Sequence, residues 1–144
     1  MKIIVTGCCG FIGSHVAESL LHRGDSVLGI DNMNDYYSVA QKEANLSILQ
    51  AYNENIQNKN IQNNYFRFEK ADIRDNETMN QLITAWQPDK ICHLASLAGV
   101  RYSIKNPQIY IRTNVEGFIN ILEASIKSGV KTIVYASSSS VYGL

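Results

Sequence analysis

The stretch KIIVTGCCGFIG at residues 2–13 decides the fold class, because an apolar strand pattern, a glycine-rich loop and the start of a helix follow one another directly. This order is the context that a dinucleotide-binding loop requires. Gly7 would allow a tight turn, Gly10 would let the backbone approach a pyrophosphate, and Gly13 would let helix and strand pack closely. The free N–H groups and the dipole of the helix N-terminus favour an anion there. The predicted cofactor contacts of this loop are Gly7, Gly10, Phe11, Ile12 and Gly13.

Two carboxylates follow at the ends of later strand patterns. Asp31 ends the second one, about 20 residues past the loop, where a carboxylate accepts hydrogen bonds from the adenosine ribose. Its charge would repel a 2′-phosphate and no arginine follows in 32-NMND-35, so NAD is favoured over NADP. Asp72, in 71-ADIRD-75, is placed to meet the adenine amino group. The alternative for Asp31 is a strand-end turn residue, and for Asp72 a turn cap.

Strand and helix patterns alternate along the whole chain. Strands are predicted at 2–6, 26–31, 65–69, 90–95 and 131–137, and helices at 11–23, 38–52, 76–86 and 107–127, with an exposed Asn/Gln-rich loop at 53–64. The first helix places Ile12, Val16, Leu20 and Leu21 on one face, and the second turns Ala44, Ile48 and Leu49 inward. Since parallel strands need helical crossovers, we predict an α/β fold, a Rossmann-type doubly wound parallel sheet of about five strands. Residues 1–144 would form one incomplete NAD-binding domain without a second domain.

Composition excludes several classes of protein. Of the 144 residues, 45% are hydrophobic and 18% charged, and the formal net charge is zero, as in a globular domain. A zero net charge gives no basic field, so we expect neither nucleic acid nor a membrane surface as a partner. The initial apolar run breaks at once into TGCCG and no run reaches the length of a membrane span. We therefore expect a cytoplasmic protein.

The cysteines and histidines have no metal-ligand spacing. Cys8, Cys9 and Cys92 are odd in number and irregularly spaced, so neither a disulfide framework nor a zinc site is predicted. A thiolate at a helix N-terminus can have a lowered pKa, so redox control by the loop cysteines is one interpretation. The other, which we favour, is that two small side chains fit a tight loop. The three histidines, His15, His22 and His93, are expected to be structural, and no metal is predicted.

Several longer motifs together resemble a known family. They are the glycine loop, 31-DNMNDYY-37, 93-HLASLAGVRYS-103, 113-TNVEGFINILEA-124 and 136-ASSSSVYG-143. This set resembles extended short-chain dehydrogenase/reductases that act on nucleotide sugars, most closely the UDP-glucuronate 4-epimerases and CapI-like capsule enzymes. The resemblance covers essentially the whole chain and implies NAD as cofactor and a UDP-uronic acid as substrate. The cofactor contacts that it adds are Asn32, Ile73, Leu94, Ala95 and Asn114.

The family chemistry implies roles for the serine run. In the family, a Tyr-Lys pair (Y-x-x-x-K) removes a proton from the sugar 4-hydroxyl while hydride moves to NAD, and the 4-keto sugar then rotates. Alignment on Val-Tyr-Gly makes Ser138 the serine that hydrogen-bonds this hydroxyl. Ser137 and Ser139 would suit a uronate carboxylate, and Arg101 would help to hold an anionic substrate unless it is simply solvated. Related dehydratases carry an Asp-Glu pair where this chain has Ser139 and Ser140.

The catalytic Tyr-Lys pair itself is absent. None of the eight tyrosines has a lysine four residues later. We therefore expect the N-terminal, NAD-binding portion of an epimerase, inactive alone. The alternatives are a non-catalytic NAD-binding module that needs a separate C-terminal chain, and an interaction protein that has lost NAD. An apolar face of the helix at 107–127 (Val115, Phe118, Leu122, Ile126) and the edge of the strand at 131–137 predict a homodimer or other self-association.

Overall fold

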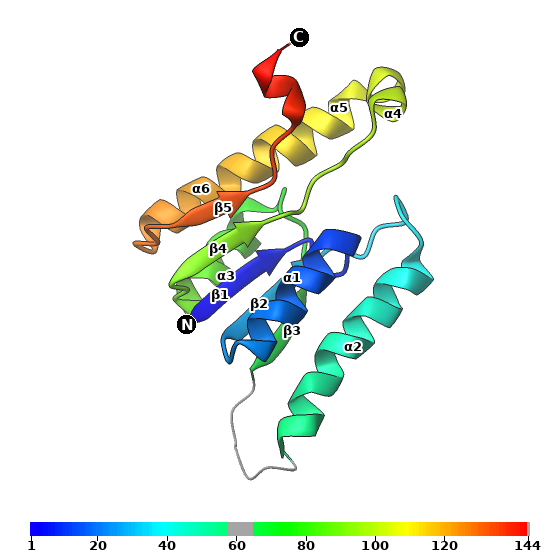
Figure 1. Cartoon of the computed structure of the whole chain (residues 1–144). Coiled ribbons are helices and arrows are strands. Elements are labelled where there is room, and N and C mark those ends of the chain that lie inside the picture. The colour runs from blue at the N-terminus through cyan, green and yellow to red at the C-terminus, as the bar shows by residue number, and fades with distance from the viewer. Residues whose placement is uncertain (58–64, 144) are drawn as a thin grey trace.

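Five parallel strands form a sheet in the order β3-β2-β1-β4-β5 in the computed structural model, which describes residues 1–57 and 65–143 (Figure 1). The strands are β1 (Lys2–Thr6), β2 (Ser26–Asp31), β3 (Phe66–Lys70), β4 (Lys90–His93) and β5 (Ile133–Tyr135). The chain moves outward from β1 to β3 and then crosses to β4 on the other side of β1. This reversal creates the crevice at which doubly wound sheets bind ligands. The predicted Rossmann-type sheet is confirmed.

Helices cover the two faces of the sheet in pairs. They are α1 (Phe11–His22), α2 (Val39–Gln57), α3 (Asn76–Trp86), α4 (Val100–Lys105), α5 (Pro107–Tyr110) and α6 (Gly117–Lys127), with a π-helical segment η1 (Ile111–Glu116) and a 3-10 turn η2 (Ser139–Tyr142). Helices α1 and α2 pack on one face, where Ala17, Leu21 and Leu49 join the core. Helices α3 and α6 pack on the other, where Met79, Ile83 and Ile121 do so. Both cores are built on strands of near-continuous apolar sequence, as expected for a parallel sheet.

The buried face of α1 differs from the predicted one. Its buried residues are Gly13, Ser14, Ala17 and Leu21, whereas Ile12 is exposed and Val16 and Leu20 are half-buried. The reason is the close approach of α1 to the glycine loop, since a Cβ on Gly13 would lie 2.0 Å from the Gly7 carbonyl oxygen. Only small side chains fit such an approach near the loop, so Ile12 and Val16 turn outward, whereas Leu21 at the far end of the helix is fully buried.

Two predictions for α2 are also wrong. Leu49 is buried, but Ala44 and Ile48 are exposed. The helix continues to Gln57, so residues 53–57 are not loop, while 58–64 lie outside the described residues. The polar Asn53 is tied to β3, because its side chain donates to the Phe66 carbonyl at 2.6 Å and accepts from the Phe66 amide at 3.0 Å. This tertiary contact favours helix where the composition predicted loop.

The predicted helix at 107–127 is continuous but not uniform. Its first four residues are α-helical with Pro107 in the first turn, η1 follows, and α6 completes it. Ile121 lies in the core with Ala124, whereas Val115 and Ile126 are exposed. The preceding short helix α4 was not predicted. Single π-helical turns inside α-helices are frequent at functional sites, which directs attention to Asn114.

Candidate functional site

The glycine loop joins β1 to α1 at the carboxyl edge of the sheet. Gly7 has a φ of +71°, and a Cβ there would lie 2.9 Å from the Ala95 amide nitrogen. The Gly10 amide donates to the Gly7 carbonyl at 3.0 Å, which closes the turn. At Gly10 a Cβ would meet only the Gly7 oxygen, at 3.3 Å, so its outer side is open. The tight turn and close packing expected of Gly7 and Gly13 are present, and Gly10 leaves room for a ligand.

The N-terminus of α1 points out of this loop without a side-chain cap. Gly10 occupies the N-cap position and has no side chain to satisfy the first helical N–H groups. Phe11 and Ile12, the first helical residues, are 81% and 61% exposed. Their backbone N–H groups and the positive end of the helix dipole therefore suit an anionic ligand.

Asp31 is buried beside the loop at the end of β2. Its Oδ2 accepts from the Cys9 amide at 3.2 Å, and its Oδ1 accepts from the Met33 amide at 2.9 Å. Lys42 of α2 donates to the same Oδ1 at 3.3 Å, and this ion pair is more than nine-tenths buried on both sides. Removing one partner of such a pair leaves an uncompensated buried charge.

Sequence reasoning missed Lys42. Its Nζ also donates to Asn34 Oδ1 at 3.0 Å, so it links Asp31 to the loop after β2. The signal available was a lysine on the inward side of a helix that follows a strand-end aspartate, and hydrophobic periodicity does not register a charged core position.

Asp72 and Asn32 meet across neighbouring strand ends. Asn32 Nδ2 donates to Asp72 Oδ2 at 3.0 Å, although 40 residues separate them. Arg74 donates to the Asp72 carboxylate through its backbone N, Nε and Nη2, and this lowers the pKa of Asp72 to about 2. The Arg74 backbone bond is the turn-cap geometry that sequence reasoning kept as its alternative. Ile73, next in the chain, is buried and packs against Gly117 of α6.

Thr6 fixes the start of the segment after β4. Its Oγ1 accepts from the amides of Leu94 and Ala95 at 3.1 and 3.2 Å and lies 2.8 Å from His93 Nδ1. With both lone pairs of Oγ1 engaged, the hydroxyl proton goes to Nδ1. Burial lowers the pKa of His93 to about 4, and its ring stacks on Phe118 at 5.2 Å. His93 thus has a structural role, while Leu94 and Ala95 lie against Gly7.

Asn114 fixes the middle of the same segment. Lying in η1, it accepts from the Leu97 amide and donates to the Leu97 carbonyl, both at 2.8 Å. The Leu97 side chain is buried. Within the described structure, the side chain of Asn114 is therefore a support for the β4 loop.

The two loop cysteines are fully buried. Their sulfurs lie 3.7 Å apart, and the Sγ of Cys8 would be 2.7 Å from a Cβ on Gly29. The contact with Cys9 and burial together raise the pKa of Cys8. This supports the interpretation that they fill a tight space. The described residues contain no group of three His, Cys, Asp or Glu side chains able to hold a metal ion.

The predicted substrate residues lie farther along the same edge. Ser137 and Ser138 follow β5 and are exposed, and Ser139 begins η2. The Ser138 carbonyl accepts from the Val141 amide at 3.2 Å. Arg101 is exposed on α4, which follows β4. Parallel strands bring the ends of β4 and β5 to one edge, so these residues share an edge with the glycine loop.

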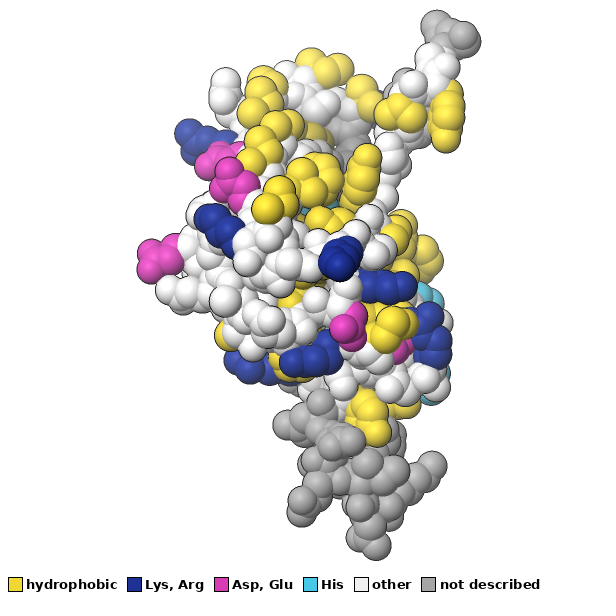
Figure 2. Space-filling view, turned by 90° about the vertical axis from the view of Figure 1, so that its left-hand side faces the viewer, with side chains coloured by type: hydrophobic (Ala, Val, Ile, Leu, Met, Phe, Trp, Pro, Cys, Tyr) yellow, Lys and Arg dark blue, Asp and Glu magenta, His cyan; other side chains and the backbone are white. Residues whose placement is uncertain are grey.

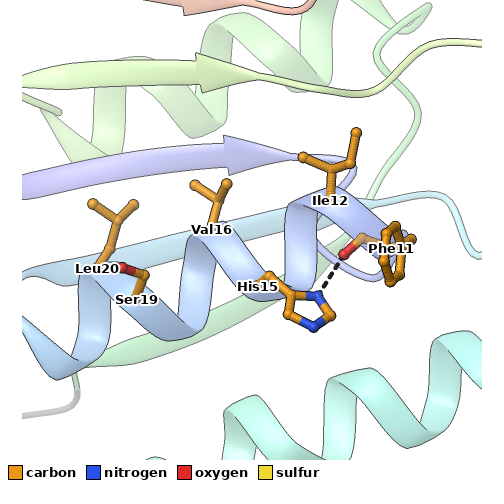
Figure 3. A pocket seen from close by; sticks show the side chains of 6 residues that line it. All are labelled: Phe11, Ile12, His15, Val16, Ser19 and Leu20. Atoms are coloured by element: carbon orange, nitrogen blue, oxygen red, sulfur yellow. Dashed lines mark hydrogen bonds between the residues drawn. The ribbon is translucent and has the colours of Figure 1, made fainter.

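An apolar groove runs along the outer side of α1. It is lined by Phe11, Ile12, His15, Val16, Ser19 and Leu20, and His15 Nδ1 lies 2.8 Å from the Phe11 carbonyl (Figure 3). Ile12, Val16 and Leu20 point along one side of the helix in this view. The groove contains neither Asp31 nor Asp72, so it is separate from the polar crevice.

Comparison with known proteins places these features in a family. Residues 4–144 match the family model described as GDP-mannose 4,6 dehydratase. Protein CapI of Staphylococcus aureus is 44% identical over 143 residues, which are 99% of this chain and 39% of CapI. UDP-glucuronate 4-epimerase 6 of Arabidopsis thaliana is 43% identical over 145 residues, covering 100% of this chain and 29% of the plant protein. The chain therefore spans about two-fifths or less of these relatives.

Solved structures agree with this assignment. UDP-glucose-4-epimerase from Stenotrophomonas maltophila, with bound NAD and formylated UDP-arabinopyranose, has a TM-score of 0.81 and 30% identity over 99% of this chain and 38% of its own. DesIV, a dTDP-glucose 4,6-dehydratase from Streptomyces venezuelae with NAD and TYD bound, has a TM-score of 0.75 and 29% identity over 92% and 38%. Among the described helices, none has the combined length and apolarity needed to cross a bilayer. The resemblance to nucleotide-sugar enzymes is confirmed, and the chain belongs to the GDP-mannose 4,6 dehydratase family, whose fold it shares with short-chain dehydrogenase/reductase epimerases and dehydratases.

Proposed function

We propose that this chain binds NAD at the carboxyl edge of its sheet, as the NAD-binding portion of a nucleotide-sugar 4-epimerase. The observation that carries the proposal is the buried carboxylate of Asp31, held against the glycine loop by the Cys9 amide. The backbone packing at Gly7 and Gly13 leaves no room for a Cβ, and Gly10 is open on its outer side, where a ligand can approach the backbone. NAD in the similar epimerase and dehydratase structures supports the same assignment.

Each part of this edge has a distinct binding task in the proposal. Gly10 and the first N–H groups of α1 bind the pyrophosphate, and Asp31 accepts hydrogen bonds from the adenosine ribose. Asp72, with Asn32 and Ile73, meets the adenine. Leu94 and Ala95 lie on the nicotinamide side, where Asn114 supports their segment through Leu97. Bound NAD supplies a hydride acceptor that returns the hydride to the sugar.

The substrate that we propose for the parent enzyme is a UDP-uronic acid. The enzyme would interconvert UDP-glucuronate and UDP-galacturonate. The names of several relatives, UDP-glucuronate 4-epimerases at 39–43% identity, support this. Ser138 would hydrogen-bond the sugar hydroxyl, while Ser137, Ser139 and Arg101 would hold the carboxylate. Serines at 139 and 140, where related dehydratases carry an acid pair, favour epimerisation over loss of water.

Calorimetric titration with NAD tests the cofactor assignment. We expect NAD to bind and NADP to bind more weakly, because a 2′-phosphate would approach the Asp31 carboxylate. Asp31→Asn should weaken NAD binding by about tenfold or more, the value of a hydrogen bond to a charged group. Since this change leaves Lys42 unpaired, the double variant Asp31→Asn/Lys42→Met is the form without a lone buried charge.

Asp35→Asn is the matched control, because Asp35 lies four residues away and is exposed. It should bind NAD as the unaltered chain does. Equal NAD affinity in the Asp31 variants, or equal affinity for NAD and NADP in the unaltered chain, would contradict the cofactor assignment.

Catalysis by the 144 residues alone is not expected, because no tyrosine is followed by lysine at the fourth position. A general base contributes about 10²–10⁴-fold to rate. Incubation with NAD and UDP-glucuronate should yield no UDP-galacturonate. The alternative function is an NAD-binding module that works with a separate C-terminal chain. Adding the remaining part of the CapI protein as a separate polypeptide tests this alternative. A chain that works with a separate C-terminal partner should then gain turnover, and a chain that does not should remain inactive.

Self-association is part of the proposal. Exposed apolar residues lie along η1, α6 and β5. They include Ile111, Val115, Ile119, Ile126, Val134 and Tyr135. Figure 2, which faces the left-hand side of Figure 1, shows hydrophobic side chains concentrated in its upper part. Exposed apolar patches of this kind mark interaction surfaces. Sedimentation should show a concentration-dependent dimer or larger species, and a stable monomer at high concentration would refute this part.

A further inference from the structure

Two motifs far apart in the sequence, DNMNDYY at 31–37 and AGVRYS at 98–103, meet at the edge of the site. The Tyr36 hydroxyl donates to the Ala98 carbonyl and lies 2.8 Å from the Tyr110 hydroxyl. Tyr110 in turn donates to the carbonyls of Ala98 and Gly99, at 2.8 and 3.0 Å. The two hydroxyls thus hold the last peptides before α4. We call Tyr36 and Tyr110 the tyrosine latch.

The latch is geometrically specific. The Tyr36 ring packs edge-on against Tyr102 at 5.4 Å, and the Tyr102 and Tyr110 rings lie 6.1 Å apart. Gly99 has a φ of +106°, and a Cβ there would lie 3.1 Å from the Tyr36 hydroxyl. Partial desolvation, followed by the hydrogen bond with Tyr36, raises the pKa of Tyr110 to about 12. Its hydroxyl therefore remains a hydrogen-bond donor at neutral pH.

Tyr36 is also linked, through Asn34 and Lys42, to the buried carboxylate of Asp31. Lys42 Nζ donates to Asp31 Oδ1 at 3.3 Å and to Asn34 Oδ1 at 3.0 Å. The same Asn34 oxygen accepts from the Tyr36 amide at 3.4 Å. A continuous hydrogen-bonded path therefore runs from Asp31 through Lys42, Asn34 and Tyr36 to the Ala98 carbonyl, and Tyr110 extends it to the Gly99 carbonyl.

The path ends on a segment that has no regular structure of its own. Residues 94–99 are held by Thr6 at their start, by Asn114 in the middle and by the latch at their end. Helix α4, which carries Arg101, begins directly afterwards at Val100. Among the described contacts of these three supports, only that of Tyr36 comes from the loop after β2, whereas Tyr110 belongs to α5.

We propose that the tyrosine latch couples the adenosine end of the cofactor site to the substrate-side segment 98–105, so that NAD binding at Asp31 orders this segment. The inference rests on the proposed NAD site. Tyr36 and Tyr110 are positioning residues in it, because they act through the backbone of Ala98 and Gly99. A ligand shifts a conformational equilibrium only through contacts that differ between the states. Ribose hydroxyls donating to Asp31 would supply that difference, since they share its carboxylate with Lys42.

Hydrogen exchange of residues 98–105, measured on the full chain with and without NAD, tests the coupling. In the unaltered chain, NAD should slow exchange there by about threefold or more, the value of about one net hydrogen bond. Tyr36→Phe should still bind NAD but lose this slowing. By linkage, its NAD affinity should fall by no more than the same factor. Tyr110→Phe should behave alike, because its hydroxyl bonds the same Ala98 carbonyl and lies 2.8 Å from the Tyr36 hydroxyl. The effects of the two changes should not add in the double variant, as expected for groups in contact.

Tyr37→Phe is the matched control. Tyr37 stacks edge-on against Tyr36 at 4.9 Å, is exposed, and its hydroxyl has no hydrogen bond among the described contacts. It should keep the NAD-dependent slowing. The coupling is overturned if the Tyr36 and Tyr110 variants keep it too, or if NAD binds the unaltered chain without slowing exchange at 98–105. Absence of NAD binding by the unaltered chain would instead refute the proposed function itself, and the coupling with it.

Discussion

The two faces of the sheet differ in how far their cover extends. On the face packed by α3 and α6, neighbouring residues Ile4, Ile91 and Ile133 all belong to or pack against one core. On the face packed by α1 and α2, the next row across the same strands is Val5, Cys92 and Val134. Val5 is fully buried, Cys92 is half-buried and Val134 is 60% exposed. On this second face, the part of the sheet that α1 and α2 cover therefore ends between β1 and β5.

This difference explains the outward residues of α1. Parallel sheets are normally covered on both faces, so an uncovered strip beside β4 and β5 is an apolar surface. Ile12, Val16 and Leu20 follow the outer side of α1 (Figure 3). Helix α1 therefore has a tightly packed side and a second apolar side, on which Ile12 is exposed and Val16 and Leu20 are only half-buried. Burial at a given position thus depends on which elements pack there as well as on residue type.

The largest expected effect is that of Gly13→Ala, which should push α1 away from the glycine loop. The added Cβ would lie 2.0 Å from the Gly7 carbonyl oxygen, a backbone atom that cannot swing away. We expect a loss of at least about 3 kcal/mol in the free energy of unfolding, the upper range for overpacking. NAD binding should be lost as well, because the loop must move. Urea denaturation and calorimetry measure the two effects.

Gly24→Ala is the control for Gly13→Ala. Gly24 has a φ of +89° with nothing within 4 Å of an added Cβ. It should cost about 1–2 kcal/mol through backbone strain alone and leave NAD binding intact. A Gly13→Ala variant as stable as Gly24→Ala would show that α1 is not held by this contact.

An intermediate effect is expected on the well-covered face, from protonation of His93. Its pKa is about 4 in the folded chain, below the ordinary 6.5, because burial disfavours the charged ring. The unfolded chain therefore binds the extra proton first, and stability should fall as pH drops from 6.5 towards 4. The full loss is about 3 kcal/mol at about 1.4 kcal/mol per pH unit. Denaturation at pH 7, 6 and 5 measures the slope.

His93→Asn is the comparison variant for this pH dependence, since it retains an acceptor near Thr6 without a titrating ring. Its stability should be nearly flat between pH 6.5 and 5. Asp72 titrates lower, near pH 2, and does not contribute in this window. An unchanged slope in the variant would mean that another group is responsible.

Much of the fold was predictable because strands of a parallel sheet have a strong local signature. The run KIIVT, the glycine spacing and Asp31 at a strand end predicted β1, the loop and β2. Which side of α1 or α2 is buried was not predictable from periodicity, since α1 has apolar residues on two sides. Helix α4 was missed because six residues are too few for a periodic pattern, and tertiary contacts at Gly99 fix its start.

The candidate site was predictable only where it depends on local geometry. Gly7 and Gly13 follow from the motif, but the partner of Asp31, Lys42, comes from a helix eleven residues later. The contact between Tyr36 and Tyr110 spans 74 residues and depends on the sheet order. Asn114 was predicted near the cofactor, but its two hydrogen bonds to the Leu97 backbone were not predicted. Such long-range pairs leave no spacing that a single sequence reveals.

The smallest expected effect is that of Val134→Thr. Val5→Thr, at the other end of the same row of residues across β1, β4 and β5, is its comparison. The substitution is nearly isosteric, so it changes mainly the cost of placing a hydroxyl at each position. At the buried Val5 an unsatisfied hydroxyl should cost about 1–3 kcal/mol. At the exposed Val134 water satisfies it, and the change should stay within about 0.5 kcal/mol. Denaturation at low protein concentration, where association is minimal, gives both values. If Val134→Thr costs as much as Val5→Thr even there, the strip beside β5 is covered in solution, and the contrast between the two faces does not hold.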